Sequence, residues 1–438
     1  MSRRRFLGLG AGALGVFGLG SAAHSTPSSP AFFEPEVRRS ASGFLNTTLR
    51  ASSAPTIVQG ESAIAAVYEG TFPGPTLRVR PGDFLQITVI NDLSEETNLH
   101  LHGMHVTPQS PGDNSLLHIP PGERFLYQFF IPPDHPGGTY FYHPHMHGKV
   151  TNQVFKGMVG LLIVEGDIDE LPGIAGLPER SLVLQRISVV NGQIPTIGSQ
   201  AGGRGNVLVN GASQPTLFIR PGETQRWRLL NATVSMLSVI QVQGHQMTVI
   251  AQDGNTVFQP TTSNSVLLAI AQRRDVLIQG GQPGMYQVTF QDTQGPGSTQ
   301  PQQFASLVVA GAPAEQRELP AVLLPFEDLR TVPITRQRTI TFNAIGPFNA
   351  KTFEGHGFVI DNQAFDPNRV DQFATLGDVD EWTIKNADVI AHPFHIHINP
   401  YQVTHINGQP FDALSYEDTT IVPPNGGSIT LRTRYEDF

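Results

Sequence analysis

A short segment occurs three times in this chain of 438 residues. Residues 75–83 read PTLRVRPGD, residues 215–223 read PTLFIRPGE, and a weaker third copy, LGD, lies at residues 376–378. A glycine turn followed by alternating polar and apolar residues predicts a turn and a β-strand. The copies are separated by whole-domain distances, unlike the short period of a solenoid, so they indicate one structural unit used three times. In every copy nine residues separate the turn glycine from the asparagine that ends the strand: Gly82 and Asn91, Gly222 and Asn231, Gly377 and Asn386.

The composition agrees with a chain built from strands and tight turns. It has 44 glycines and 35 prolines, together with short runs rich in Val, Ile, Thr and Phe, which favour an all-β fold. A chain of this length is too long to fold around a single hydrophobic core. We therefore predict three related β-sandwich domains over residues 51–166, 181–311 and 333–438, with Pro/Gly/acid-rich joins between them. Residues 24–50 read as a Ser/Pro-rich lead-in with little core of its own.

Charge and cysteine content exclude several kinds of function. The net charge is -9 and no basic run occurs outside the N-terminus, which speaks against nucleic acid as a partner. The chain contains 0 cysteines, so these residues form no disulfide, no thiolate metal site and no cysteine nucleophile.

The N-terminus has the pattern of an export signal. Residues 2–7 read SRRRFL, a twin-arginine pattern, followed by a weakly apolar, glycine-rich stretch and by Ser21, Ala22 and Ala23. A transmembrane anchor is the alternative, but the stretch is short and rich in glycine. We predict a signal peptide over residues 1–23, the twin-arginine export machinery as a partner, and a periplasmic or secreted protein that has no membrane contact after processing.

Histidines occur in pairs one residue apart at three places: His100 and His102, His143 and His145, and His395 and His397, the last preceded by His392. On an extended strand, both side chains of such a pair point to the same face. We therefore predict that the pairs converge on one metal centre. The pairs lie in the first and third domains, so the centre is expected at their interface, with the second domain as a spacer and its His245 structural.

The number of histidines favours a cluster of ions. Imidazole suits copper, zinc, iron and nickel, and six histidines exceed the three protein ligands of a catalytic zinc. His392 lies three residues before His395, with Pro393 between them, so period two does not place it on the same face. We expect it to serve a different ion nearby.

These histidine segments, HLHG at 100–103, YHPHMHG at 142–148 and HPFHIH at 392–397, resemble the motifs of the multicopper oxidases, the family of laccases, ascorbate oxidases and bacterial cuprous oxidases. The resemblance covers nearly the whole mature sequence and implies cupredoxin-like Greek-key domains. It implies a trinuclear copper cluster plus a type 1 copper ion in the full-length protein. The implied ligands are His100 and His395 for the type 2 ion, His102, His143, His145 and His397 for the type 3 pair, and His392 for the type 1 ion.

The implied reaction couples one-electron oxidation of a small reducing substrate, a phenol or cuprous ion, to four-electron reduction of dioxygen to water. Asp113 lies where the family often keeps a carboxylate that assists proton delivery, and a turn residue is an equal reading of it. His105 and His147 are expected to support the ligands or lie at the surface. We assign no function to His24, His135, His356 or His405, and His118 is expected to be structural.

The chain departs from the family at its fourth motif, His-Cys-His, which these residues do not contain. Gly122 opens a strand and His143 follows 21 residues later; Gly427 opens the matching strand of the third domain, so the partner motif belongs near position 448. We therefore expect a third domain that is incomplete at its C-terminus, an unpaired strand edge there, and no activity from the 438-residue chain alone.

Two alternatives use a similar fold. A non-enzymatic periplasmic scaffold or cell-division protein agrees with the absence of cysteine, although the chain keeps all three histidine pairs. A copper nitrite reductase normally has two domains per chain and a single type 2 ion, so the three-unit layout argues against it.

Overall fold

The computed structural model describes residues 30–197, 205–293, 300–345 and 357–438. The predicted signal peptide, His24 and His356 lie outside these ranges. Regular structure within them is almost entirely β-strand, with two short helices, α1 (Val150–Phe155) and α2 (Asp167–Glu170), and one 3-10 turn, η1 (Leu329–Thr331). None of the helices in the described part of the chain has the length and apolar character needed to cross a membrane.

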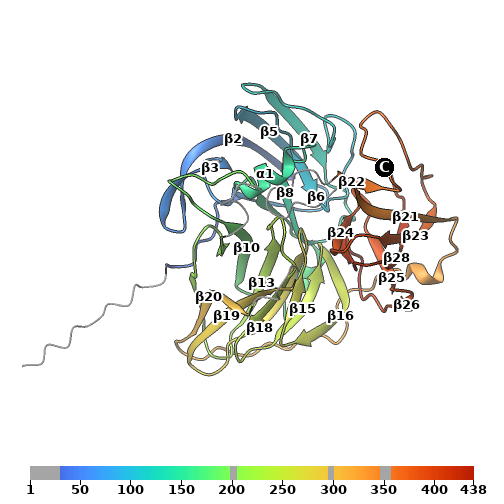
Figure 1. The fold of residues 1–438 in the computed structure, drawn as a ribbon. Helices are drawn as coiled ribbons and strands as arrows, with labels where there is room; N and C mark the ends of the chain where they lie inside the picture. Colours follow the sequence, from blue (N-terminus) through green and yellow to red (C-terminus); the bar gives the residue numbers. More distant parts are fainter. Residues whose placement is uncertain (1–29, 198–204, 294–299, 346–356) are drawn as a thin grey trace, which may run out of the picture.

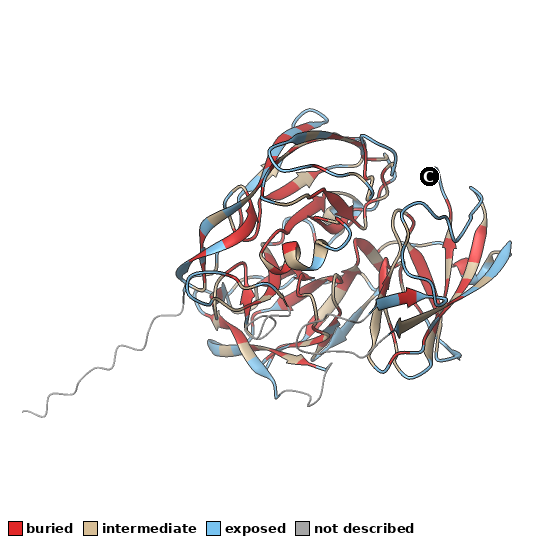
Figure 2. Cartoon of the chain, turned by 45° about the horizontal axis from the view of Figure 1, so that its top comes forward, coloured by how far each residue is buried: buried red, intermediate tan, exposed pale blue. Residues whose placement is uncertain are grey.

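The strands form three lobes in chain order, with domain 1 in blue to teal, domain 2 in green to yellow, and domain 3 in orange to red (Figure 1). Each lobe has two sheets whose buried side chains share one core, for example Leu49, Ile87 and Leu162 in domain 1. Buried residues run along the strands in each lobe (Figure 2). The predicted all-β fold of three sandwich domains is confirmed.

Domain 1 contains a four-stranded and a five-stranded sheet. The first has the order β3 (Glu61–Tyr68), β2 (Phe44–Val58), β5 (Phe84–Asp92), β7 (Arg124–Phe130). The second has the order β1 (Val37–Arg39), β4 (Thr76–Val79), β9 (Gly160–Val164), β8 (Gly138–His143), β6 (His100–His102). The histidine-bearing strands β6 and β8 therefore lie together at one edge of the second sheet.

Domain 2 contains a six-stranded and a five-stranded sheet. The first has the order β11 (Asn206–Val209), β10 (Glu179–Ile187), β13 (Thr224–Asn231), β18 (Arg273–Gln279), β15 (Met247–Gln252), β16 (Asn255–Ser263). The second has the order β12 (Thr216–Ile219), β20 (Gln302–Val309), β19 (Gly284–Asp292), β14 (Ser238–Val242), β17 (Val266–Leu268).

Domain 3 has one long sheet and one short sheet. The long sheet has the order β22 (Gly357–Ile360), β21 (Arg336–Ile345), β23 (Val379–Asn386), β28 (Gly427–Arg434), β25 (Tyr401–Ile406), β26 (Gln409–Pro410). The short sheet pairs β24 (His392–His395) with β27 (Thr419–Val422). In domain 2, β14 pairs on both sides, with β17 and with β19. Among the described residues, β24 pairs with β27 alone, and the incomplete third domain stays a prediction.

The threefold repeat is visible in the hydrogen bonds. The repeated strands β5, β13 and β23 each run parallel to one neighbour (β2, β10 or β21) and antiparallel to another (β7, β18 or β28). Each begins after a turn glycine with positive φ, 85° at Gly82, 76° at Gly222 and 86° at Gly377. That left-handed backbone favours glycine because a Cβ atom would clash there.

The asparagine at the end of each repeated strand is fully buried and makes the same bonds in all three domains. Asn231 donates from Nδ2 to the carbonyl oxygens of Met236 and Leu268, both at 2.9 Å, and its Oδ1 accepts from the amide of Thr233. Asn91 and Asn386 repeat this pattern with the equivalent carbonyls and with the amide two residues on. The side chain thus joins the end of one strand to the entry of a distant one.

The expected lead-in at residues 24–50 is wrong for its second half. Strand β2 begins at Phe44 and runs through Ala51, and Leu45 and Leu49 belong to the core of domain 1. Its alternation is carried partly by threonine and alanine, so a hydrophobic run does not mark where it starts. β2 lies parallel to β5 over residues 44–52, and this pairing places it inside the sandwich.

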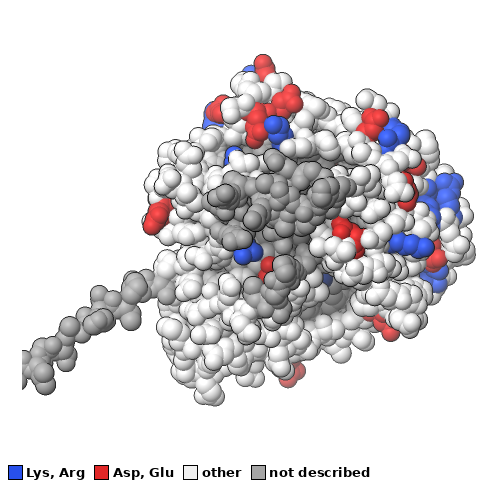
Figure 3. All heavy atoms as spheres, viewed as in Figure 1, with Lys and Arg blue, Asp and Glu red and all other residues white. Residues whose placement is uncertain are grey.

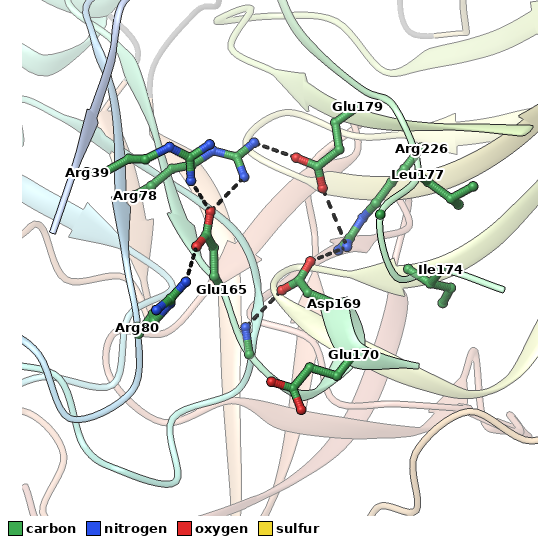
Figure 4. Close-up of a pocket in the computed structure, with 12 residues that line it drawn as sticks. Arg39, Arg78, Arg80, Glu165, Asp169, Glu170, Ile174, Leu177, Glu179 and Arg226 are labelled. Carbon is green, nitrogen blue, oxygen red and sulfur yellow. Dashed lines mark hydrogen bonds and ion pairs between the residues drawn. The ribbon is translucent and has the colours of Figure 1, made fainter. Parts of the chain in front are cut away.

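A charged junction joins domains 1 and 2 around a cavity of about 650 Å³ (Figure 4). Arg78 of β4 pairs with Glu165 at 3.0 Å and with Glu179 of β10, and Arg226 of β13 pairs with Asp169 at 2.6 Å. Glu179 also pairs with the buried Arg228 at 2.5 Å. The outer surface differs: on the face drawn in Figure 3, charges of both signs are interspersed at the top and right, and the lower part is mostly uncharged.

We predict that Glu179→Gln lowers stability at neutral pH by about 2 kcal/mol, because it leaves buried arginines short of a carboxylate. The arginines around Glu179 outweigh its burial and hold its pKa well below the ordinary value near 4.5. Its contribution is therefore complete above that value and is lost as the pH falls below it. Chemical denaturation of wild type and variant from pH 7 to 3 should show the difference shrinking. Glu61→Gln at an exposed site is the control, and a pH-independent difference would contradict the assignment.

We predict that Asn231→Ala costs about 3 kcal/mol of unfolding free energy, because it leaves two buried carbonyls and a buried amide without their partner. Asn264→Ala, at an exposed position of the same domain, should change stability by less than about 0.5 kcal/mol. Thermal and denaturant unfolding of the two variants measures the loss of stability. Equal losses would show that the hydrogen bonds of the Asn231 side chain do not stabilise the domain.

Candidate metal centre

Six of the seven predicted ligands come together where domains 1 and 3 meet. Strand β24 faces the edge of domain 1 that carries β6 and β8 (Figure 1). The ring of His102 stacks on that of His395 with centroids 3.8 Å apart, and His100 stacks on His397 at 4.1 Å. The His145 ring lies 4.8 Å from the His397 ring. The three pairs therefore converge, and each domain supplies one side of the cluster.

The strand argument for the pairs holds only for the first of them. His100 and His102 both lie in β6. β8 ends at His143 and β24 ends at His395, so the second member of each later pair lies beyond its strand. Pro144 lacks an amide hydrogen and cannot extend the ladder. The expectation that all three pairs are strand pairs is wrong, although all six rings still reach the same place.

The buried ring nitrogens of the cluster are left without hydrogen-bond partners. Nε2 of His100, His143 and His395 is buried and accepts or donates no hydrogen bond. Nitrogen atoms of His100, His102 and His395 all lie within 4.8 Å of one another. Because a buried polar atom without a partner is costly, a set of such atoms facing one volume fits a metal ion. The geometry therefore suits a group ligated by imidazole.

The opposite nitrogen of each of these three rings is occupied. Nδ1 of His100 lies 2.9 Å from Asp113 Oδ2, and Nδ1 of His143 lies 2.8 Å from its neighbouring carbonyl at Pro144. Nδ1 of His395 lies 2.7 Å from the Asp418 carbonyl. These acceptors assign the proton to Nδ1 and leave the Nε2 lone pair for a metal, the usual arrangement around ligating histidines.

His102 is turned the other way. Its Nε2 lies 3.3 Å from Asp418 Oδ1 and 3.2 Å from Thr419 Oγ1. The carboxylate assigns the proton to Nε2, so Nδ1 is the atom available to a metal. One member of the cluster therefore uses the opposite ring nitrogen from its neighbours.

Burial keeps all six imidazoles neutral. Desolvation is the main cause that lowers the pKa of each ring, and for most of them the neighbouring histidines lower it further. The pKa of His143 falls to about 3, and those of His100, His102 and His397 lie well below the ordinary value. Metal binding needs the neutral ring, so the apo site is already in the binding form.

Asp113 is in contact with the cluster and is not an exposed turn residue. Its side chain is buried, Oδ1 accepts from the Leu101 amide, and Oδ2 lies 2.9 Å from His100 Nδ1. Burial raises the pKa of this carboxyl to about 8. Asp113 lies in a loop, as expected of a turn residue, and its backbone amide donates a hydrogen bond to the Thr107 carbonyl.

Sequence reasoning missed the residues that hold the ligands from behind. Asp418 contacts both His102 and His395, and Asn98 accepts the His145 amide at 2.6 Å. Neither Asp418 nor Asn98 belongs to a sequence motif that has the spacing of metal ligands. The one available signal was charge: an Asp next to two threonines at the start of an otherwise apolar strand, β27.

Domain 2 is not merely a spacer. Arg273 in β18 is fully buried and forms an ion pair with Asp418, and Gln272 donates to the Thr419 carbonyl at 2.8 Å. Both bonds cross to the segment of domain 3 that supports the histidines. The expectation that domain 2 is a spacer considered only the metal ligands, and Arg273 and Gln272 are not among them.

His392 lies apart from the six, as expected from its spacing. Its Nε2 pairs with Asp388 at 3.0 Å, and its ring contacts Phe342 and Phe358. It lines a cavity of about 600 Å³ between the sheets of domain 3, beside Trp382. The ring contacts of the described residues do not connect it with the histidine cluster.

A smaller cavity of about 240 Å³ reaches the cluster from the side of domain 2. His102, His143, His145 and His395 form its inner end. Its walls are mainly apolar and come from α1 and from two loops of domain 2: Val150, Val154, Ala232, Val234, Ile270 and Ala271.

The remaining histidines have ordinary partners. His105 bonds the Ile398 carbonyl, and its amide donates to His135, so it supports the domain 1–domain 3 contact. His147 is exposed beside Phe365, and the exposed His118 lies near Glu96. His245 bonds backbone groups of domain 2 at Gln243 and Gly281.

This chain is similar in sequence and in fold to known proteins. The multicopper oxidase of Staphylococcus haemolyticus is 26% identical over 405 residues, which cover 89% of this chain and 82% of that protein. The cell division protein FtsP of Salmonella typhimurium is 27% identical over 399 residues, covering 86% and 80%. A solved multicopper oxidase of Campylobacter jejuni, described as a metallo-oxidase, has the same cupredoxin-like fold, with a TM-score of 0.81 and 24% identity over 94% of this chain and 90% of that one.

The family profiles cover all three sandwiches. Profiles described as multicopper oxidase match residues 51–168, 186–312 and 333–437 in succession. Together with the paired histidines and the threefold fold, they confirm the resemblance seen in the sequence motifs. The chain belongs to the multicopper oxidase family.

Proposed function

We propose that this protein is a copper-dependent oxidoreductase that couples one-electron oxidation of a small reducing substrate to reduction of dioxygen to water. The observation that carries the proposal is the convergence of six histidine rings between domains 1 and 3, three of which have a buried Nε2 atom without a hydrogen-bond partner. When bound there, copper supplies one-electron redox chemistry and open positions for oxygen.

The chain's own residues have defined tasks in this proposal. His100 and His395 hold the type 2 ion, and His102, His143, His145 and His397 hold four positions of the type 3 pair. Burial excludes water from the rings and keeps them neutral. Asp113 orients His100 and, by family resemblance, assists proton delivery to oxygen.

The apolar cavity beside the cluster supports dioxygen as a substrate. Its walls suit a small uncharged molecule, and four cluster histidines form its inner end. The cavity at His392 has phenylalanine and tryptophan walls, and we propose it as the side from which a type 1 ion held by His392 would receive electrons. We propose a phenol or cuprous ion as the reductant, and periplasmic or secreted localisation through twin-arginine export.

A scaffold function is the second candidate. The 27% identity with a cell division protein favours it, since that similarity is as high as the one to the staphylococcal oxidase. The convergence of six histidines favours the oxidase, because a scaffold has no need of six buried neutral imidazoles. Copper binding separates the two.

We predict that the purified chain binds Cu(II) at the cluster, and that His100→Ala weakens binding at least about tenfold, the lower end for a damaged metal site. Competition with a chromophoric chelator measures the affinity, and elemental analysis gives the stoichiometry. His118→Ala, whose side chain is 55% exposed, is the control and should bind like wild type. A wild-type chain that binds no copper would favour the scaffold.

We predict that the copper-loaded 438-residue chain shows no intense blue absorption band and consumes no oxygen with a phenolic substrate. The chain has 0 cysteines, and the intense blue absorption of a type 1 site requires a thiolate. Without that site, electrons have no path from substrate to cluster. Visible absorption and an oxygen electrode test both points, and a blue, active preparation would show that the electron-entry site is wrongly assigned.

A further inference from the structure

We propose that Arg273 of domain 2 is a positioning residue of the metal centre: its two-pronged ion pair with Asp418 fixes the carboxylate that turns His102 so that Nδ1 faces the cluster. This inference rests on the proposed copper site. It concerns a residue from the one domain that supplies no ligand.

The guanidinium of Arg273 is completely enclosed, and each of its three nitrogens donates a hydrogen bond. Its Nη1 donates to Asp418 Oδ1 at 2.9 Å, and its Nη2 donates to Asp418 Oδ2. Nε donates to the Thr139 carbonyl at 3.2 Å, and Nη1 also reaches the Ala271 carbonyl at 3.0 Å. The Phe141 ring lies beneath it, 5.6 Å from the guanidinium carbon. One side chain therefore touches all three domains.

The paired carboxylate is the point where this rigidity reaches the histidines. Asp418 Oδ1 accepts from Arg273, from the Thr419 hydroxyl at 2.8 Å and from His102 Nε2 at 3.3 Å. The Asp418 carbonyl accepts from His395 Nδ1 at 2.7 Å. A carboxylate held by two parallel N–H bonds cannot rotate about its own axis. It therefore presents Oδ1 to His102 in one orientation.

Domain 2 fixes the same segment from a second side. Asp253 Oδ1 accepts the Arg273 amide at 2.9 Å, and Asp253 Oδ2 lies 3.4 Å from the Thr419 amide. Gln272 donates to the Thr419 carbonyl. The start of β27 is thus held by three side chains of domain 2, and two cluster histidines depend on its position.

A purely structural ion pair is the competing explanation, and the chain contains a matched control for it. Arg228 is as buried as Arg273, pairs with a buried carboxylate at Asp275 (2.9 Å) and also bonds Thr139, through Oγ1. Its other partners are carboxylates, including Glu179. The recorded contacts of the described residues join Arg228 to no histidine.

The test compares Arg273→Lys with Arg228→Lys. Lysine keeps the charge but has no planar fork, so Arg273→Lys loses its two-pronged pair with Asp418, and Arg228→Lys loses part of its bonds to Asp275, Asp169 and Glu179. Two readouts are used: the tautomer of His102 by nitrogen NMR of histidine-labelled apo protein, and Cu(II) affinity by chelator competition. We expect Arg273→Lys to lose the single Nε2–H form of His102 and to bind Cu(II) at least about tenfold more weakly. Arg228→Lys should lower the melting temperature but leave both readouts at wild-type values.

The Asp418→Asn variant gives a second route to the same result, since it removes the charge and leaves one acceptor oxygen where His102 and the two arms of Arg273 now share two. If Arg273 acts through Asp418, the variant with both Arg273→Lys and Asp418→Asn binds copper with an affinity within about twofold of Asp418→Asn alone. The reason is that the effects of two substitutions in one hydrogen-bond network do not add. Asp418→Asn also carries both readouts if Arg273→Lys does not fold.

Unchanged His102 tautomer and copper affinity in Arg273→Lys, or in Asp418→Asn, would overturn the inference, as would equal losses in the Arg228→Lys control. A wild-type chain without Cu(II) affinity would instead overturn the proposed function. The tautomer in the apo protein would then still decide the role of Arg273, so the two failures are distinguishable.

Discussion

The molecule is organised around the desolvation of six imidazole rings. A buried ring nitrogen without a partner costs about 1–3 kcal/mol, and three histidines of the cluster have such an atom. The fold keeps them there because their opposite nitrogens are held by a carboxylate or by carbonyls and because two sandwiches close over them. The apo state thus carries an energetic deficit that a bound ion would remove, which is the physical basis of the metal site.

Buried ion pairs join the domains of this molecule, where a smaller protein would use apolar packing. The first two domains meet across the network of Arg78, Glu165 and Glu179, and the second and third meet through Arg273 and Asp418. Ion pairs of this kind define relative orientation more sharply than apolar contacts do, since a planar guanidinium accepts a carboxylate in few geometries. Domain 2 therefore carries the orientation of the other two, although it has no ligand of its own.

The sequence predicts the fold well because the repeat is local. A turn glycine, an alternating strand and a closing asparagine each have a short-range cause, so even the weak copy at Gly377 marks a real strand. The convergence of the histidine pairs also follows from their spacing and from the family motifs. The start of β2 was misplaced because threonine and alanine carry its pattern, and its partner strand lies far along the chain.

The supporting residues could not be predicted for a related reason. Asp418, Arg273 and Asn98 act through contacts between domains, and no period or spacing in one segment encodes a contact with another. The rings of His145 and His397 join the cluster as predicted, but their strand placement was wrong, since a strand can end at the first histidine of a pair without moving the second ring away. Local patterns therefore identify the ligands, and only the assembled structure identifies what orients them.

The division of the cluster between two domains has a consequence for how an ion is held. Neither half offers more than four of the six rings, so strong binding requires domains 1 and 3 to stay docked. Docking acts as a high effective concentration of one half for the other, and an ion that bridges them acts as a cross-link between distant parts of the chain. By linkage, the ion should then stabilise the docked arrangement as strongly as docking stabilises the ion. Metal affinity and the cohesion of the three domains are, in this protein, one thermodynamic quantity measured from two sides.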